Sequence, residues 1–169
     1  MESPERDLVA AHGGMPGGVM IAAFFLGLAP AMLDPGRAEV LAVVDAAFAG
    51  IAAKDEAAIR AQLRPTGTAT VIMEKVDGSR TVRSVDLAAW ASVDSGPERY
   101  NEQMVAPTIA IDGAIATVSG RYIFAIDGTI RHCGYQHFDL VRDAGVWKIQ
   151  NVTWSVRTFG CGATRARRQ

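Results

Sequence analysis

The chain has 169 residues, which is the size of one domain with an extension. Hydrophobic residues make up 49% and charged residues 21%, a composition that excludes a disordered or collagen-like chain. Lysine and arginine number 17 against 18 acidic residues, so the formal net charge of −1 gives no indication of nucleic-acid or anionic-membrane binding. Two cysteines are too few for a disulfide scaffold or, without a histidine cluster, for a zinc finger.

The N-terminal segment, residues 1–31, is interpreted as a leader. Residues 19–31 form an apolar run without charge that is too short to cross a bilayer of roughly 30 Å, so no stable membrane span is expected. Its length suits a signal-peptide core, and Ala29-Pro30-Ala31 offers a small-x-small cleavage pattern. The acidic start of the chain argues the other way. Cleavage after about Ala31 would give a periplasmic or secreted protein; the alternative is a cytoplasmic protein whose apolar helix packs on the domain.

Two helices are expected next. Residues 37–53 carry apolar side chains at spacings of three and four, which predicts a helix with one buried stripe of Leu41, Val44, Phe48 and Ile51. Asp55 stands where an N-cap is wanted, ahead of a second helix over residues 56–63. The two elements therefore form a helix pair with a short connection.

From Gly67 the apolar period changes to two, which is typical of strands. A strand over residues 68–74, a turn at Asp77-Gly78 and a return over residues 80–83 form a hairpin. Ser84 is the expected cap of a short helix over residues 85–92.

Four long strands complete the chain, over residues 99–111, 114–126, 129–142 and 146–158. Two-residue connections that contain glycine separate them, which predicts three successive hairpins. Strands of this length must twist, so we expect an α+β fold in which a curved antiparallel sheet holds the helices on its concave side.

This order of elements resembles the nuclear transport factor 2-like superfamily, which includes ketosteroid isomerase and the SnoaL-like cyclases. The resemblance rests on residues 38–55, 132–149 and 153–161 and covers about residues 37–161. It implies a cone-shaped domain over residues 32–161 with a deep pocket, a homodimer through the outer sheet face, and diverse activities. Residues 162–169 are expected to be a basic disordered tail. Fold similarity alone does not transfer chemistry.

The expected pocket lies on one face of the last hairpin. A two-residue loop at Ala144-Gly145 pairs Leu140 with Ile149 and Phe138 with Asn151. The shared face is then apolar near the turn, and it becomes polar away from it through Gln136 and His132. A mostly apolar surface with a few convergent polar groups is typical of a small-molecule site. The ligand-binding candidates are Gln136, Phe138, Asn151, Trp147 and Phe124.

Three residues are candidates for catalysis. The side chain of histidine titrates near neutral pH, so His132 is suited to general acid–base catalysis. Tyr122 lies two residues from Phe124 and therefore on the same face of its strand, which would place a phenol in the cavity. Asp45 lies at the edge of the apolar stripe of the first helix. Each also fits a structural role, as a hydrogen-bonded histidine, a packed tyrosine and a solvated aspartate.

These residues leave two hypotheses about function. One is a non-catalytic module that binds a small hydrophobic or amphipathic molecule; the other is a cofactor-independent lyase, isomerase or hydrolase in which His132 moves a proton. The lack of an acidic partner for His132 and of any nucleophile motif favours the first. No cofactor is expected, and no metal, because no three ligands share a face at workable spacing.

The two cysteines pose a separate question. The expected strand pairing puts Cys133 opposite Val156, five residues short of Cys161. A bridge needs Cα atoms within about 7 Å, so two free thiols are slightly favoured over a disulfide.

Overall fold

The computed structural model describes residues 35–162; the expected leader and basic tail lie outside the described residues. The chain divides into two units, residues 1–32 and 33–169, and the second unit forms the domain. Within residues 35–162, no helix is both long enough and apolar enough to cross a membrane.

The helices follow the sequence expectation with small shifts. They are α1 (Pro35–Ala53), α2 (Glu56–Arg60) and α3 (Leu87–Trp90). The buried face of α1 centres on Val40, Val44, Ala47 and Phe48, whereas Leu41 and Ile51 are half-buried at its edge. The Asp55 carboxylate caps α2 by accepting from the backbone N–H of Ala58 at 2.9 Å. The cap of α3 is Asp86 and not Ser84, because β2 continues through Ser84.

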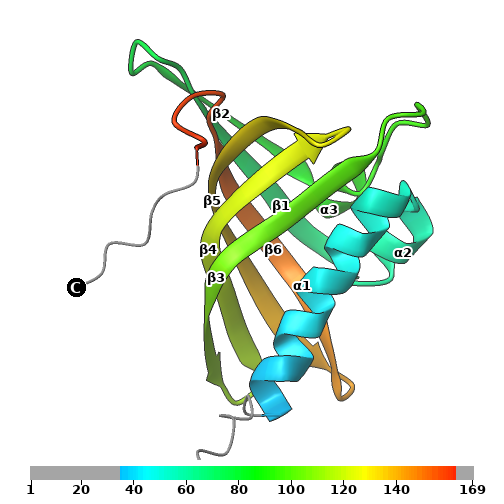
Figure 1. Cartoon of the computed structure of the whole chain (residues 1–169). Helices are drawn as coiled ribbons and strands as arrows, with labels where there is room; N and C mark the ends of the chain where they lie inside the picture. The colour runs from blue at the N-terminus through cyan, green and yellow to red at the C-terminus, as the bar shows by residue number, and fades with distance from the viewer. Residues whose placement is uncertain (1–34, 163–169) are drawn as a thin grey trace, which may run out of the picture. The chain divides into compact units, whose positions relative to one another are not determined.

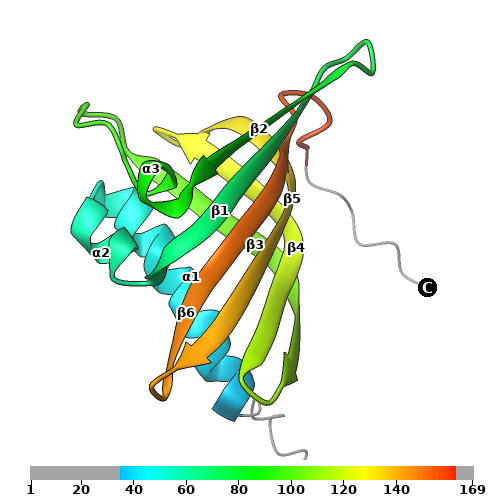
Figure 2. The same ribbon diagram turned by 180° about the vertical axis from the view of Figure 1, so that it is seen from behind.

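Six strands form one curved sheet, which the helices cover on one side (Figures 1 and 2). They are β1 (Leu63–Glu74), β2 (Arg80–Asp86), β3 (Tyr100–Asp112), β4 (Ile115–Ile126), β5 (Thr129–Asp143) and β6 (Val146–Val156). Their order is β2-β1-β6-β5-β4-β3, so the α+β class and the meander of four long strands are confirmed. Within the described residues the sheet is mostly antiparallel, and the one parallel pair is β1 with β6, which sequence reasoning did not predict.

A bulge in β6 changes which side chains share a face. Leu140 pairs with Ile149 as expected, but Asp139 then pairs with Asn151, and Phe138 lies opposite Val152. The expected pairing of Phe138 with Asn151 is therefore wrong. The extra residue is Gln150, whose side chain donates to the carbonyl oxygen of Thr66 at 3.0 Å. One inserted residue moves every later side chain of the strand to the other face.

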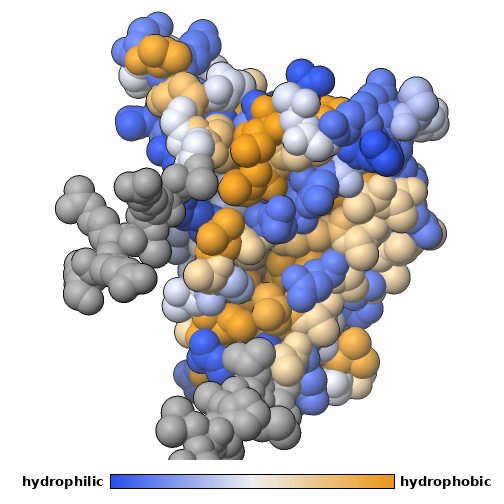
Figure 3. Space-filling view, in the orientation of Figure 1, coloured by the Kyte–Doolittle hydropathy of each residue, from blue (hydrophilic) through white to orange (hydrophobic). Residues whose placement is uncertain are grey.

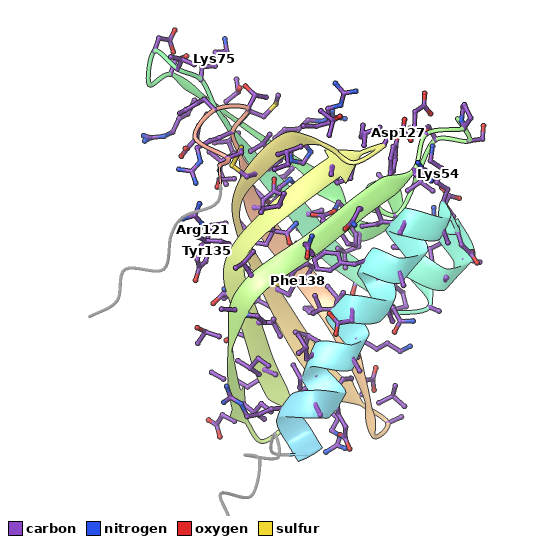
Figure 4. The ribbon with its side chains drawn as sticks, viewed as in Figure 1. Lys54, Lys75, Arg121, Asp127, Tyr135 and Phe138 are labelled. Carbon is purple, nitrogen blue, oxygen red and sulfur yellow. A yellow bond between two sulfur atoms is a disulfide. The ribbon has the colours of Figure 1, made fainter. Side chains whose placement is uncertain are left out.

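The narrow part of the concave face is filled by a packed core. Phe138 is fully buried and meets Phe48 of α1 edge to face, with ring centroids 5.8 Å apart. Figure 4 shows Phe138 between the sheet and α1. Trp147 belongs to the same core, with 5% of its surface exposed. The apolar half of the expected pocket is therefore solid.

Cys133 and Cys161 form a disulfide, with Cα atoms 5.5 Å apart. The expectation of free thiols is wrong for two reasons. The bulge advances β6 by one residue, so that Cys133 lies opposite Arg157. The chain then turns back through Gly160, whose φ of 66° is a left-handed conformation that glycine adopts without strain.

Candidate functional site

A group of polar side chains occupies the concave face beyond the packed core. Tyr122 of β4 is buried, and its hydroxyl oxygen lies 3.1 Å from Nδ1 of His132 on β5. The same hydroxyl donates to the carbonyl oxygen of Ser155 at 3.0 Å. Because a phenol has one hydrogen, Nδ1 of His132 is the donor to the tyrosine oxygen, and the lone pair of the neutral ring lies at Nε2.

Aromatic packing fixes the His132 ring. It stacks on Phe124 with centroids 4.6 Å apart and an interplanar angle of 11°, and Phe124 meets Tyr100 edge to face at 5.3 Å. Burial lowers the pKa of His132, which favours the neutral imidazole. Burial also raises the pKa of Tyr122, and the nearby Glu102 carboxylate adds to that effect. The pair is therefore a neutral hydrogen-bonded unit at physiological pH.

Glu102 of β3 is an acidic group on this face that sequence reasoning did not single out. It is half-buried and lies opposite Phe124 in the sheet, and one carboxylate oxygen accepts a hydrogen bond from the side-chain amide of Gln136. Burial raises the pKa of Glu102 to about 7, although the bond from Gln136 acts to lower it. The carboxyl group therefore exchanges its proton near neutral pH.

The signal for Glu102 was present in the sequence but weak. Within β3 it shares parity with Tyr100 and Met104, and the three alternate with more exposed neighbours. That alternation indicates a glutamate on the same face as two large side chains. The position of Glu102 beside Phe124 depends on the register between β3 and β4, which the alternation within β3 does not determine.

Gln136 is suited to hold either form of this carboxyl group. Its side chain is buried, with 3% of the residue exposed, and its amide oxygen has no hydrogen-bond partner among the described residues. An amide carries donors at one end and an acceptor at the other. Rotation by half a turn would therefore let the amide oxygen of Gln136 accept a hydrogen bond from the neutral acid, whereas the present orientation donates a hydrogen bond to a carboxylate oxygen.

Glu102 faces a hollow of about 460 Å³ between β3 and α1. Figure 3 shows apolar side chains along this seam with hydrophilic groups among them. Asp45 enters the hollow from α1, and burial raises the pKa of its carboxyl group. The walls that matter most for a ligand are Leu41, Asp45 and Phe48 of α1 and Tyr100, Glu102 and Met104 of β3. We call this space the α1/β3 hollow.

Lys54, Asp94 and Tyr100 form a polar cluster, which we call the clasp, at one end of the α1/β3 hollow. Lys54, which follows α1, donates to Asp94 at 2.7 Å and to the carbonyl oxygen of Gly96 at 2.8 Å, and its Nζ lies 4.1 Å from the centroid of the Tyr100 ring. The hydroxyl of Tyr100 donates to the other oxygen of Asp94. The bonds from Lys54 and Tyr100 lower the pKa of Asp94 to about 2. The clasp therefore fixes the Tyr100 ring over the hollow.

The structure separates the sequence-derived candidates into four places. Tyr122, His132, Gln136 and Phe124 come together beside Glu102, and Asp45 reaches the adjoining α1/β3 hollow. Phe138 and Trp147 are packed in the core, so their expected contact with a ligand needs correction. Asn151 also needs correction, because the β6 bulge turns it to the outer face, where it donates to Asp139 at 3.3 Å and accepts from the N–H of Thr68 at 3.1 Å.

Within residues 35–162 no three histidine, cysteine, aspartate or glutamate side chains gather as a metal site. His137 and Asp139, with Nε2 and Oδ1 2.9 Å apart, are a pair on the outer face without a third such ligand in that range. The polar groups of the described site are carboxyl, imidazole, phenol and amide groups.

Comparison with solved structures identifies the fold. An NTF2-like protein with a cystatin-like fold from Novosphingobium aromaticivorans matches 75% of this chain and 85% of its own, with a TM-score of 0.56 and 13% identity. The chain has the nuclear transport factor 2-like (NTF2-like) fold. The comparison with family models gave no match, and no curated protein matches the sequence.

Two further structural neighbours differ in what their names say. A provisionally named dehydratase of the NTF2-like family from Streptomyces avermitilis covers 72% of this chain and 96% of its own, with a TM-score of 0.58 and 12% identity. The beta subunit of a provisionally named aromatic-ring-hydroxylating dioxygenase from Novosphingobium aromaticivorans covers 73% and 90%, with a TM-score of 0.58 and 9% identity. At these identities the NTF2-like fold is shared, and the activity of this chain must be argued from its own residues.

Proposed function

We propose that this NTF2-like domain binds a small, mostly apolar molecule with one carbonyl or hydroxyl group in the α1/β3 hollow, and that Glu102 exchanges a proton with it. The observation that carries the proposal is the Glu102 carboxyl group at the wall of that hollow, bonded to buried Gln136. Sequence reasoning favoured binding without catalysis because His132 had no acidic partner and no nucleophile motif was present. Glu102 is hydrogen-bonded to Gln136 and not to His132, and the proposal gives the proton-transfer role to this carboxylate in place of the histidine.

The proposed step is a proton transfer without a cofactor. The Glu102 carboxylate takes a proton from a carbon next to the ligand's carbonyl group, which leaves an enolate and a neutral carboxylic acid. The acid then returns the proton to the same or to a conjugated carbon, so that no other reactant is consumed. A carboxyl group that titrates near the working pH performs both halves of such a step efficiently.

Gln136 and the His132–Tyr122 pair have supporting parts in this proposal. Gln136 would turn its amide to match each protonation state of Glu102. His132 is a further candidate at the site, since the lone pair of Nε2 is left open by the bond at Nδ1. That role stays a prediction.

Hydrogen–deuterium exchange tests the step directly. We expect the protein to accelerate exchange of the protons next to the carbonyl of 1-tetralone in D₂O, followed by NMR. Glu102→Gln should reduce the acceleration by at least about a hundredfold, the usual range for loss of a general base. Asp127→Asn is the matched control, because Asp127 is an exposed turn carboxylate and does not line the hollow.

A variant that fills the α1/β3 hollow tests whether tetralone binds there. Ala49→Phe places a ring in the α1/β3 hollow from an exposed helix position and should abolish tetralone binding while the domain stays folded. If tetralone binds to the unaltered protein without faster exchange, the non-catalytic alternative holds. If it does not bind at all, the proposal is wrong for this class of ligand.

We also propose export, with the leader removed after about Ala31. The disulfide between Cys133 and Cys161 supports it, because structural disulfides persist in oxidising compartments. The intact mass of the protein purified from its own cells would show both the missing leader and the loss of two hydrogens. A full-length mass with two free thiols would contradict export.

A homodimer through the outer face of the sheet is the remaining proposal. That face holds a hollow of about 350 Å³ lined in part by Ile111, Ile115 and Val141, and Ile115 is 59% exposed. A second copy would cover these side chains. Sedimentation should show a dimer that Ile115→Arg dissociates; a monomer at all concentrations would contradict the proposal.

A further inference from the structure

A separate hollow lies on the outer face of the sheet, away from α1. It has a volume of about 560 Å³ and is formed by β4, β5 and the segment that follows β6. Figure 4 shows Arg121 and Tyr135 on the opposite side of the sheet from Phe138 and α1. The lining residues are Arg121, Gly134, Tyr135, Arg157, Phe159 and Gly160. None of them lines the α1/β3 hollow.

The side chains that line this outer hollow include two arginines and no acidic residue. Arg121 is exposed, and no carboxylate of residues 35–162 forms an ion pair with it. Arg157 forms an ion pair with Glu74, with Nε 3.7 Å from the carboxylate oxygen, and this buried Nε has no hydrogen-bond partner in the same range. Two guanidinium groups with unused donors at one cavity are suited to an anion, and a carboxylate matches their fork geometry.

Aromatic side chains supply an apolar surface beside these charges. Tyr135 is 49% exposed and lies directly opposite Arg121 across β4 and β5. The hydroxyl of Tyr135 donates to Ser119 at 3.3 Å, which holds its ring in position. Phe159, which is 38% exposed, lines the hollow from the segment after β6. Exposed rings of this size favour a flat apolar partner.

The disulfide fixes this arrangement. Cys133 of β5 bonds Cys161, and the short segment between Arg157 and Cys161 carries Phe159 and Gly160 over the hollow. The backbone of Arg157 pairs with Cys133 through two hydrogen bonds, of 2.9 and 2.8 Å. The wall that Phe159 provides is thus held at both of its ends, so little ordering is needed when a ligand binds.

We propose that this outer hollow is a binding site for a small organic anion, a carboxylate on a flat apolar body. The carboxylate lies between the guanidinium groups of Arg121 and Arg157, and the apolar body lies against Tyr135 and Phe159. This site is distinct from the proton-transfer site on the concave face and does not depend on it.

Amide NMR with 1-naphthoate as the probe tests the proposal. Titration should shift the resonances of Tyr135, Phe159 and Gly160, and 1-naphthalenemethanol, which has the same rings without the charge, should bind at least about tenfold more weakly. Arg121→Gln should raise the Kd of naphthoate by about tenfold or more. Arg99→Gln, at an exposed position outside the hollow, is the matched control and should leave the Kd unchanged.

Three outcomes would overturn the proposal. Shifts that map to Asp45 and Glu102 would place naphthoate in the α1/β3 hollow instead. Equal affinity for naphthoate and the alcohol, or an unchanged Kd in Arg121→Gln, would show that no anion site exists. The double variant Cys133→Ser/Cys161→Ser should also weaken naphthoate binding several-fold, and an unchanged Kd there would remove Phe159 and its segment from the site.

Discussion

At the scale of single residues, the pairing of Glu102 with Gln136 carries the proposed proton transfer. A glutamate at this depth without a partner would be costly, and one beside a cation would be permanently ionised. A neutral amide partner leaves the carboxyl group able to change its charge, with a pKa of about 7. This property separates a proton-transfer site from a structural ion pair.

The raised pKa of Glu102 predicts a pH dependence of stability. In the unfolded chain the carboxyl group titrates near its ordinary value of 4.5, and in the folded protein near 7. Between these values the folded state binds the proton more tightly, so its contribution is fully favourable below pH 4.5 and is lost as the pH rises through 7. The loss amounts to about 2 kcal/mol in the free energy of unfolding.

Urea unfolding at pH 5 and pH 8 measures this loss. We expect Glu102→Gln to gain about 2 kcal/mol relative to the unaltered protein on going from pH 5 to pH 8, because the glutamine does not titrate. His132, whose lowered pKa acts in the opposite direction, is present in both proteins and cancels in the comparison. Parallel pH profiles for the two proteins would show that Glu102 is ionised in both states at pH 5.

At the scale of elements, the contact between β5 and β6 depends on a glycine. A Cβ at Gly134 would lie 1.9 Å from the carbonyl oxygen of Ser155, the oxygen that accepts from Tyr122. The absent side chain therefore lets β6 approach closely enough to orient the Tyr122–His132 pair.

Gly134→Ala should destabilise the domain by about 2–4 kcal/mol, since two backbones must separate to admit the methyl group. Thermal unfolding checks this value, with Gly162→Ala as the control because nothing lies within 4 Å of a Cβ there. A change below about 0.5 kcal/mol at Gly134 would mean that β6 can shift without cost.

The disulfide joins β5 to the segment after β6 across 28 residues of chain. Closing a loop of that length in the unfolded state stabilises the folded protein by about 3–4 kcal/mol. Cys133→Ser/Cys161→Ser should lose this amount in urea unfolding, whereas added reductant should not change the stability of that variant. Equal stability of the two proteins under oxidising conditions would contradict the contribution of the bridge.

At the scale of the whole domain, the concave face is divided between core and site. Phe48, Phe138 and Trp147 fill the narrow part, and the α1/β3 hollow opens beside the polar part. The packed side chains of the narrow part hold the sheet against α1. They thereby keep the strands that carry the polar side chains in position.

Phe138→Ala tests that division, because it removes a fully buried ring from the contact with α1. We expect a loss of about 3–5 kcal/mol in the free energy of unfolding. Phe159→Ala, at a position that is 38% exposed, should cost far less. A small effect at Phe138 would indicate that the narrow part of the concave face is hollow after all.

The sequence by itself determined the elements of this domain and their type. The spacing of Val44 and Phe48 predicts the amphipathic α1, the Asp55 cap fixes the start of α2, and the glycine turns set the long hairpins. These signals are local, since helix period, capping and turn conformation depend on neighbouring residues. His132 and Gln136 could be placed on one face of their strand by alternation alone, whereas Tyr122 shares that face only because the ladder between β4 and β5 has a register shift after Phe124.

Only the tertiary structure decided what those elements bring together. The Gln150 bulge, which turned Asn151 outward and brought Cys133 within reach of Cys161, has no signature in the alternation of the strand. Glu102 lies 34 residues from Gln136 and meets it only through the pairing of β3, β4 and β5. Contacts of this kind depend on register summed over several strands, and a shift of one residue in any of them reverses the face on which a side chain lies.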